Sequence, residues 1–286
     1  MSISPSNKSA DAKVSGVSVG IPIWSSHIEA KNALQDVLSQ DSTHINEILI
    51  SISKSDISRE SFGFLSELDS RVSLFFTSED LSLYENFKKL ATLATSDYFV
   101  WFCADDRHPQ NFISEHLITL DNNNDLNLSS SAYDFWLYDT KTLLLTPPIT
   151  HPCKDWDSVK SKLLRNRTVG IAPTHLWFGV WRRKELLKIW PEIEFDWLDL
   201  YLIEVTLRSN GLDINTSENI KFRAGRKIVY KKFISKKIRV GSYLIFSLKS
   251  IFLESEISIF VKAISLLRLL RVVHLSFKLN HDLIID

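Results

Sequence analysis

The feature that most constrains this chain is the pattern of a buried strand that ends in two acids. Residues Tyr98 to Cys103 are all apolar or aromatic, and Asp105 and Asp106 follow after a single alanine. An uninterrupted apolar run of this length is typical of a strand buried on both faces. In open α/β sheets ligands bind at the carboxyl ends of the strands, so paired acids here favour a ligand-binding crevice. A solvated loop that happens to contain two aspartates is the alternative that these residues alone leave open.

The segments before this run alternate between strand and helix patterns. β-rich runs at 17–23, 47–52 and 71–76 are separated by polar loops, and apolar residues recur at helical spacing in 28–40 and 86–94. Strands that alternate with helices indicate βαβ units and a mostly parallel sheet. The sequence therefore predicts an α/β fold.

The pattern is looser after the acids. We predict a strand at 132–138, a proline-interrupted loop at 143–157, a strand at 174–181, a short basic helix at 182–190 and a helix at 195–211. Gly179 lies inside the second of these strands, where a missing side chain suggests close approach by a ligand or another backbone. Gly211 is the expected C-terminal stop of the last helix.

Length and composition fit a globular protein of one large or two modest domains. The chain has 286 residues, of which 44% are hydrophobic and 24% charged. Its two cysteines, Cys103 and Cys153, give neither a disulfide framework nor zinc-ligand spacing, which is typical of a reducing cytosol. No apolar run approaches the roughly 20 residues of a membrane span. We expect a cytoplasmic protein, with residues 1–15 as a flexible tail that lacks the apolar core of a secretory signal.

Charge is distributed unevenly along the chain. Lys plus Arg and Asp plus Glu each number 34, but residues 221–286 hold 14 of the bases and only 4 of the acids. Apolar runs at 243–253 and 257–275 predict two amphipathic helices in a C-terminal extension, 226–286. These helices either pack on the main domain as a cap or lie on an anionic membrane surface. No nucleic-acid-binding motif accompanies the charge, so nucleic acid is not an expected partner.

The order of these segments resembles the family 2 glycosyltransferases with the GT-A fold, over about residues 15–225. VSVGIPI resembles the family's first strand, EILISISKSD its second strand and loop, and LYENFKKLATLATSDYFVWFCADD the helix and strand that lead into its DxD-type metal motif. THLWFGVWRRKEL resembles the acceptor-side strand and helix, and FDWLDLYLIEVTLRSNG the helix that bears the catalytic base. The resemblance implies a Rossmann-like, mostly parallel mixed sheet flanked by helices, in a domain at 16–225.

The activity that the resemblance implies is a metal-dependent, inverting transfer of a sugar. The donor would be a nucleotide-diphosphate sugar and the acceptor a glycan or a lipid-linked glycan, in a setting such as surface polysaccharide synthesis. Mn²⁺ or Mg²⁺, held by carboxylates and phosphates, would neutralise the charge that grows on the leaving diphosphate. By the resemblance Asp106 is the metal ligand, and Asp105 binds the metal or the donor ribose.

Further donor contacts follow from the same resemblance. The residues at matching positions are Pro22, Trp24, Ser53, Asn86 and Arg223, with His151, His175 and Trp177 as candidates for the acceptor pocket. Two positions depart from the family pattern. Cys103 stands where many members carry the first acid of the metal motif, and Ile52 and Ser53 stand where the second-strand loop usually has an acidic pair.

An inverting transfer also needs a base that takes the proton from the acceptor hydroxyl. Asp196 matches the position of the family's base, and Asp199 lies one turn further on the same face of the predicted helix. Either acid can instead stabilise the helix N-terminus through the helix dipole.

Two other functions remain open on the sequence. A nucleotidyltransferase-like enzyme would also use paired acids, but it would usually show a glycine-rich phosphate loop with a lysine after the first strand, and IPIWSSH has neither. A degenerate GT-A domain that binds a nucleotide or serves as a scaffold without turnover is favoured by the missing acids at Cys103 and Ile52.

Overall fold

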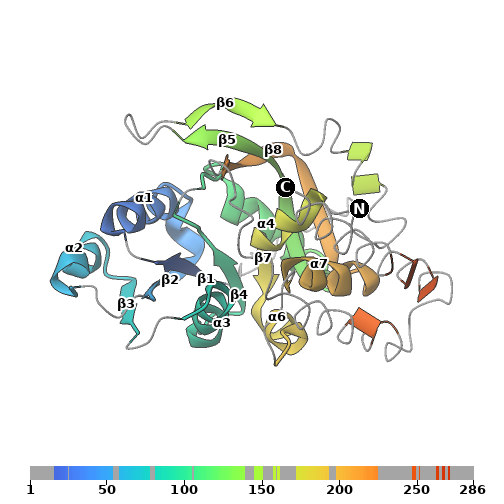
Figure 1. The fold of residues 1–286 in the computed structure, drawn as a ribbon, viewed down its shortest axis with the longest axis horizontal. Coiled ribbons are helices and arrows are strands. Elements are labelled where there is room, and N and C mark those ends of the chain that lie inside the picture. Colours follow the sequence, from blue (N-terminus) through green and yellow to red (C-terminus); the bar gives the residue numbers. More distant parts are fainter. Residues whose placement is uncertain are drawn as a thin grey trace, which may run out of the picture.

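The computed structural model is an eight-stranded sheet with helices on both of its faces (Figure 1). It describes residues 16–24, 26–53, 58–77, 81–104, 106–138, 145–150, 157–158, 160–161, 172–192 and 198–224, and the single positions 247, 248, 251, 262, 263, 266, 267 and 270. The predicted tail at 1–15 and almost all of the predicted extension at 226–286 therefore lie outside the described residues.

Strands and helices alternate through the first half of the chain, as the sequence predicts. The first nine elements are β1 (Val17–Ile23), α1 (His27–Leu38), the 3-10 helix η1 (Ser42–His44), β2 (Ile45–Ile52), α2 (Glu60–Leu68), β3 (Val72–Phe76), α3 (Leu83–Leu93), β4 (Tyr98–Trp101) and α4 (Phe112–Asp121). They are followed by β5 (Leu128–Tyr138), β6 (Leu145–Thr150), the 3-10 helix η2 (Ala172–Phe178), β7 (Val180–Arg182), α6 (Arg183–Ile189), α7 (Leu198–Arg208) and β8 (Leu212–Ala224).

The sheet is mixed and mostly parallel, which confirms the predicted fold class. Its strand order is β3-β2-β1-β4-β7-β5-β6, with β8 also paired to β5. The pairs β1–β2, β2–β3, β1–β4 and β5–β8 are parallel, whereas β7 is antiparallel to β4 and β5, and β6 is antiparallel to β5.

The order of the first four strands creates a switch point, where the direction of winding changes, at the carboxyl ends of β1 and β4. From β1 the chain winds outward through α1, β2 and α2 to β3, and then returns through α3 to β4 on the other side of β1. Because such crossovers are right-handed, the outward and returning helices lie on opposite faces, as α1 and α3 do in Figure 1. The direction of winding reverses between β1 and β4, and ligands bind at the carboxyl ends of such strands.

Local sequence signals explain several element boundaries. A capping box formed by Ser82 and Glu85 starts α3. At the end of α7, Asn210 adopts a left-handed conformation with φ 63°, its N–H donates to the Leu207 carbonyl, and the Gly211 N–H donates to the Thr206 carbonyl. These bonds form a Schellman motif. The residue that stops the helix is therefore Asn210, and the expectation for Gly211 is corrected.

Two predicted elements are wrong and three are missing from the prediction. Residues 174–178 belong to η2, and only Val180 and Trp181 of the predicted strand at 174–181 lie in a strand, β7. Short apolar runs do not distinguish a strand from a buried helical turn. The predicted loop at 143–157 contains β6, an edge strand in which prolines are tolerated because no neighbour needs their N–H. The sequence patterns did not indicate α2, α4 or β8.

Gly179, directly before β7, lies too close to β5 to accommodate a side chain. A Cβ atom on Gly179 would lie 2.4 Å from the Ser129 carbonyl oxygen and 2.6 Å from the Ser130 Cβ. The sequence left open whether a ligand or another backbone approaches this glycine. The structure shows the backbone of β5 close to it.

We predict that Gly179→Ala lowers the free energy of unfolding by about 1–3 kcal/mol, because β5 must move to admit the methyl group. Gly63→Ala is the matched control: Gly63 lies inside α2, and no atom lies within 4 Å of the position that its methyl group would take, so alanine should stabilise the helix by about 0.5–1 kcal/mol. Urea unfolding measures the change in the free energy of unfolding for both variants. Equal effects of the two substitutions would contradict the packing described here.

Candidate active site

The loop that carries the acids leaves the sheet at the reversal of winding. The Phe102 N–H donates to the Gly20 carbonyl of β1 (2.9 Å), which extends the β1–β4 pairing by one residue. The Asp106 N–H then donates to the Cys103 carbonyl (3.2 Å) and closes a turn. Asp106 is 5% exposed and so is held against the protein at this edge. Asp105 lies outside the described residues.

The end of β1 contributes one exposed aromatic side chain. Trp24 follows β1 directly and is 49% exposed, whereas Pro22 is half-buried within the strand. Ser53 is fully buried, its N–H donates to the Ile23 carbonyl (3.0 Å), and its hydroxyl lies 3.5 Å from the same oxygen. Of the predicted nucleotide contacts here, Trp24 is accessible to a ligand, while Ser53 joins β2 to β1.

Asn86 lies on α3 with an unpaired acceptor. Its side chain is buried, and no described residue donates a hydrogen bond to its Oδ1. The carbonyl of the next residue, Phe87, accepts a hydrogen bond from the indole N–H of Trp101 at the end of β4 (3.2 Å). A buried acceptor without a partner costs about 1–3 kcal/mol, so Asn86 is a position at which a bound ligand would supply a missing bond.

An aromatic cluster fixes η2 against the end of β4. Its members are Tyr84, Phe87, Trp101, Trp177, Phe178 and Trp190, with neighbouring ring centroids 4.7–6.3 Å apart. Trp177 is 3% exposed, and its carbonyl accepts a hydrogen bond from the Trp181 indole (2.7 Å). It is therefore part of the core, which weakens its candidacy for the acceptor pocket.

The acceptor side also contains a neutral histidine and the start of α7. Burial lowers the pKa of His175 to about 4, and its ring lies 5.4 Å from that of Tyr133. Asp199 accepts a hydrogen bond from the Leu200 N–H (2.9 Å) in the first turn of α7, which packs against η2. This bond lies in the first turn of the helix, where the sequence analysis gave Asp199 either a helix-stabilising role or the role of the base. His151, Asp196 and the side chain of Arg223 lie outside the described residues.

Sequence reasoning missed a buried polar layer beneath the acidic loop. Asp36, in the last turn of α1, and Gln40, just after its C-cap residue Ser39, are 8% and 4% exposed. Asp36 contacts His108, and Gln40 contacts Pro109 and Ile113. The signal that could have revealed it was the pair of polar residues at i and i+4 among the apolar positions of a helix that the sequence predicts to be amphipathic.

A second histidine lies fully buried in this layer. Both ring nitrogens of His116 on α4 contact serine hydroxyls of β5, Nδ1 with Ser129 Oγ (2.8 Å) and Nε2 with Ser131 Oγ (2.8 Å). Burial is the main cause that lowers the pKa of His116 to about 3; Asp213 acts weakly in the opposite direction. The imidazole is therefore neutral in the folded protein at neutral pH.

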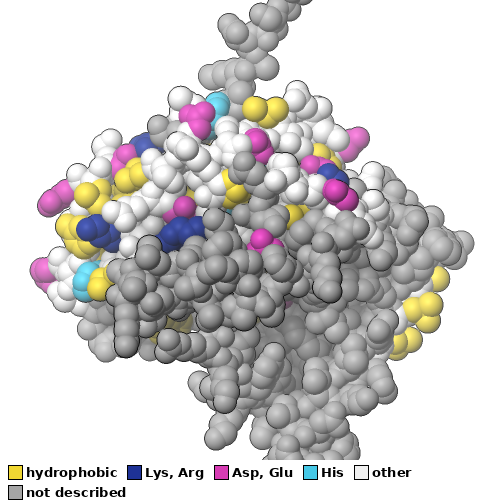
Figure 2. All heavy atoms as spheres, turned by 90° about the horizontal axis from the view of Figure 1, so that it is seen from above, with side chains coloured by type: hydrophobic (Ala, Val, Ile, Leu, Met, Phe, Trp, Pro, Cys, Tyr) yellow, Lys and Arg dark blue, Asp and Glu magenta, His cyan; other side chains and the backbone are white. Residues whose placement is uncertain are grey.

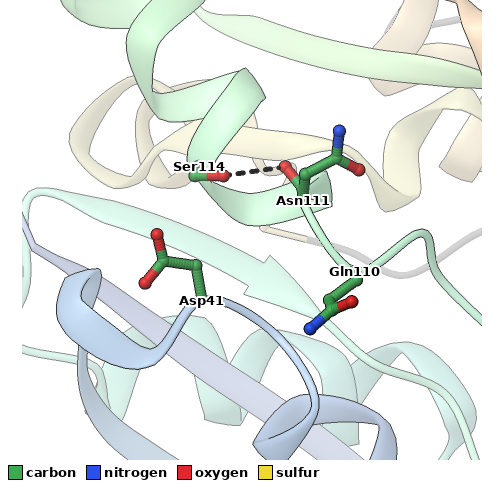
Figure 3. A pocket seen from close by; sticks show the side chains of 4 residues that line it. All are labelled: Asp41, Gln110, Asn111 and Ser114. Carbon is green, nitrogen blue, oxygen red and sulfur yellow. Dashed lines mark hydrogen bonds between the residues drawn. The ribbon is translucent and has the colours of Figure 1, made fainter.

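A separate open cavity of about 570 Å³ lies where the chain after α1 meets the start of α4. Asp41, Gln110, Asn111 and Ser114 line it and face one another across it (Figure 3). The Asp41 carboxylate accepts hydrogen bonds from the N–H and hydroxyl of Thr43 (3.2 and 3.0 Å). None of the predicted site residues that the structure describes lines this cavity.

Surface charge on the face seen in Figure 2 is mixed. In its described part, acidic and basic side chains are interspersed with uncharged ones and do not gather by sign. Such a face does not generate the single-sign field that steers a highly charged partner.

The donor set at the acidic edge suits a hard divalent cation. Carboxylate and phosphate oxygens are the ligands that Mg²⁺ and Mn²⁺ prefer, and Mg²⁺ needs only one or two carboxylates beside the phosphates of a nucleotide. Among the described residues, which leave out Asp105 and Asp196, no three His, Cys, Asp or Glu side chains cluster as a complete metal site.

Comparison with known families decides what this arrangement is. The model of "Glycosyl transferase family 2" matches residues 18–190. The chain belongs to this family. The match includes β1, the acidic loop and η2, and so confirms the resemblance drawn from the sequence. A comparison with curated proteins finds no significant match.

Solved structures confirm the GT-A fold at low sequence identity. TarS of S. aureus has a TM-score of 0.60 and 10% identity, covering 89% of this chain and 43% of TarS. The mannosyltransferase PcManGT from Pyrobaculum calidifontis, in complex with GDP-Man and Mn²⁺, has a TM-score of 0.60 and 13% identity, covering 90% and 70%. TarS 1–349 in complex with UDP has a TM-score of 0.59 and 10% identity, covering 89% and 70%. This family 2 chain thus spans less than half the length of the first TarS structure.

The part of the chain that the structure describes contains no helix with both the length and the apolar character needed to cross a bilayer.

We predict that the free energy of unfolding falls as the pH drops below about 6.5. The unfolded chain protonates His116 near its ordinary pKa of 6.5, whereas the folded chain does not until about pH 3, so protons favour unfolding between these values. One such group contributes a slope of up to about 1.4 kcal/mol per pH unit. Urea unfolding between pH 7 and 4.5 should show a shallower slope for His116→Gln than for the wild type. An unchanged slope in His116→Gln would contradict this.

Proposed function

We propose that this family 2 chain is a metal-dependent, inverting glycosyltransferase that uses a nucleotide-diphosphate sugar. The observation that carries the proposal is the position of the acidic turn, directly after β4 and at the point where the winding of the sheet reverses. Two of the similar structures contain GDP-Man with Mn²⁺ and UDP, which supports a donor of this class.

Donor binding is assigned to the ends of β1 and β4. Trp24 stacks on the base, since an exposed indole beside a nucleotide crevice offers a flat apolar face. The carbonyl of Asn86 takes its missing hydrogen bond from the donor or from a water bound with it. Ser53 does not touch the donor but stabilises the end of β1 through its hydrogen bond to the Ile23 carbonyl. Arg223 contacts the diphosphate.

Asp106 and Asp105 would hold Mn²⁺ or Mg²⁺ together with the donor phosphates. The cation supplies Lewis-acid stabilisation to the departing diphosphate. Cys103 replaces the first acid of the family pattern, and thiols are poor ligands for these hard cations, so the two aspartates carry the metal site without it.

The proton of the acceptor hydroxyl passes to Asp196. Asp199 is the weaker candidate because its carboxylate is bonded to the first turn of α7. His175 is neutral at neutral pH and can hold the acceptor by a hydrogen bond without repelling the forming cationic sugar. The acceptor is a glycan or lipid-linked glycan of a surface polysaccharide, and the basic C-terminal segment positions the enzyme at the cytoplasmic face of an anionic membrane.

Binding is tested by thermal shift with UDP, GDP, Mn²⁺ and Mg²⁺. A ligand that binds only the folded state raises Tm by mass action. We expect one nucleotide to raise Tm only when the metal is present, and Asp106→Ala to lose this shift. A metal-independent shift, or an equal shift in Asp106→Ala, would contradict the assigned metal site.

Turnover is tested by hydrolysis of the matching nucleotide sugar and by transfer to a glycan acceptor. Asp196→Asn should bind the nucleotide as the wild type does and transfer about 10²–10⁴-fold more slowly, which is the usual contribution of a general base. Asp199→Asn is the matched control and should retain most of the transfer. Metal-dependent nucleotide binding without hydrolysis or transfer by the wild type would instead indicate the degenerate binding module.

A further inference from the structure

We propose that Asp36, in the last turn of α1, and Gln40, directly after the helix, form a clamp that positions the acidic loop for the metal and the diphosphate. This inference rests on the proposed function, and it assigns two positioning residues that do not themselves touch the substrate. The clamp is defined as Asp36, Gln40 and the segment that they hold, His108 to Ile113.

The clamp grips the chain just after the acids. Asp36 Oδ2 accepts hydrogen bonds from the His108 N–H (3.2 Å) and from His108 Nδ1 (2.8 Å). Gln40 Nε2 donates to the Pro109 carbonyl (2.8 Å), and Gln40 Oε1 accepts from the Ile113 N–H (3.3 Å). One side chain at the end of α1 and one directly after the helix therefore hold the exit of the loop through these hydrogen bonds.

The entry and exit of the loop also touch each other. The His108 ring stacks on the Phe102 ring with centroids 3.9 Å apart and an interplanar angle of 27°. Phe102 is itself tied to β1 through the Gly20 carbonyl. The acids thus lie on a short loop whose two ends are fixed to each other, to β1 and to α1.

Burial makes this arrangement stiff. The side chains of His108 and Asp36 are 1% and 7% exposed, and a buried pair of this kind is strongly destabilised when one partner is removed. Hydrogen bonds behind metal ligands typically control metal affinity by 10- to 100-fold because they fix the orientation of the ligands. The clamp is well placed to do this, since His108 is two residues from Asp106.

The clamp lies next to the open cavity between the chain after α1 and the start of α4. Gln40 and Pro109 directly precede Asp41 and Gln110, which line the cavity of Figure 3. The segment after α1 and the segment before α4 are thus hydrogen-bonded to each other at Gln40 and Pro109. The next residue of each segment lines the cavity. Loss of the clamp would leave the two segments free to move apart at this cavity.

The test compares Asp36→Asn with Asp121→Asn. Asp121 accepts a short hydrogen bond from the Tyr98 hydroxyl (2.5 Å) at the opposite end of β4, so its loss weakens the fold away from the loop. The probes are Mn²⁺ with UDP or GDP by calorimetry, and hydrogen exchange of the amides of residues 103–108. We expect Asp36→Asn to raise the Kd of Mn²⁺ about tenfold, to speed exchange in the loop, and to leave metal-free nucleotide affinity within about twofold.

Asp121→Asn should lower Tm without changing the Mn²⁺ Kd or the exchange of residues 103–108. His108→Phe keeps a ring on Phe102 but loses the Nδ1 contact with Asp36. It should weaken Mn²⁺ binding as Asp36→Asn does, and it replaces that variant if Asp36→Asn does not fold. Wild-type Mn²⁺ affinity and loop exchange in both clamp variants would overturn the inference while leaving the proposed function intact. If the wild type binds no Mn²⁺ with either nucleotide, the proposed metal role fails, and loop exchange alone then decides whether the clamp holds the loop.

Discussion

The parallel pairing of β1 with β4 is the constraint on which the rest of the structure depends. Gly20 lies opposite Trp101 in this pair, and a Cβ there would lie 2.7 Å from the Phe99 ring and 3.1 Å from the Leu90 Cβ, so the missing side chain leaves room for the Phe99 ring and α3 to pack over β1. The pairing brings together two carboxyl ends that are about 80 residues apart in the chain. It also separates α1 from α3, and so gives the acidic loop one helix on each side (Figure 1).

The two halves of the sheet serve different purposes. The half made of β1 to β4 is parallel and regular, and it presents Trp24, Asn86 and the acids at one edge. The other half is built around the short antiparallel strand β7, and the aromatic cluster fastens η2 to the end of β4. The two halves of the sheet are therefore joined by packed aromatic rings, and such dense packing limits their relative movement.

The sequence predicted the parallel half well because its signals are local. The run that ends at Asp106 is apolar enough to identify β4, and β1 matches its predicted bounds of 17–23. The acceptor half escaped prediction because its form depends on tertiary contacts: η2 is helical because Trp177 packs on Trp101, and β8 forms because β5 offers it a partner. The clamp residue Asp36 could not be assigned, since its meaning depends on His108, which is 72 positions away. The family resemblance supplied the site residues that no local pattern identifies.

The central claim is that the acidic turn between β1 and β4 binds a donor diphosphate through a divalent cation. Anomalous diffraction from a crystal grown with Mn²⁺ and the nucleoside diphosphate that the protein binds tests it most directly. The account predicts one manganese peak within coordinating distance of a carboxylate oxygen of Asp105 or Asp106 and of the diphosphate. A nucleotide bound elsewhere, or a manganese peak distant from both aspartates, would contradict it.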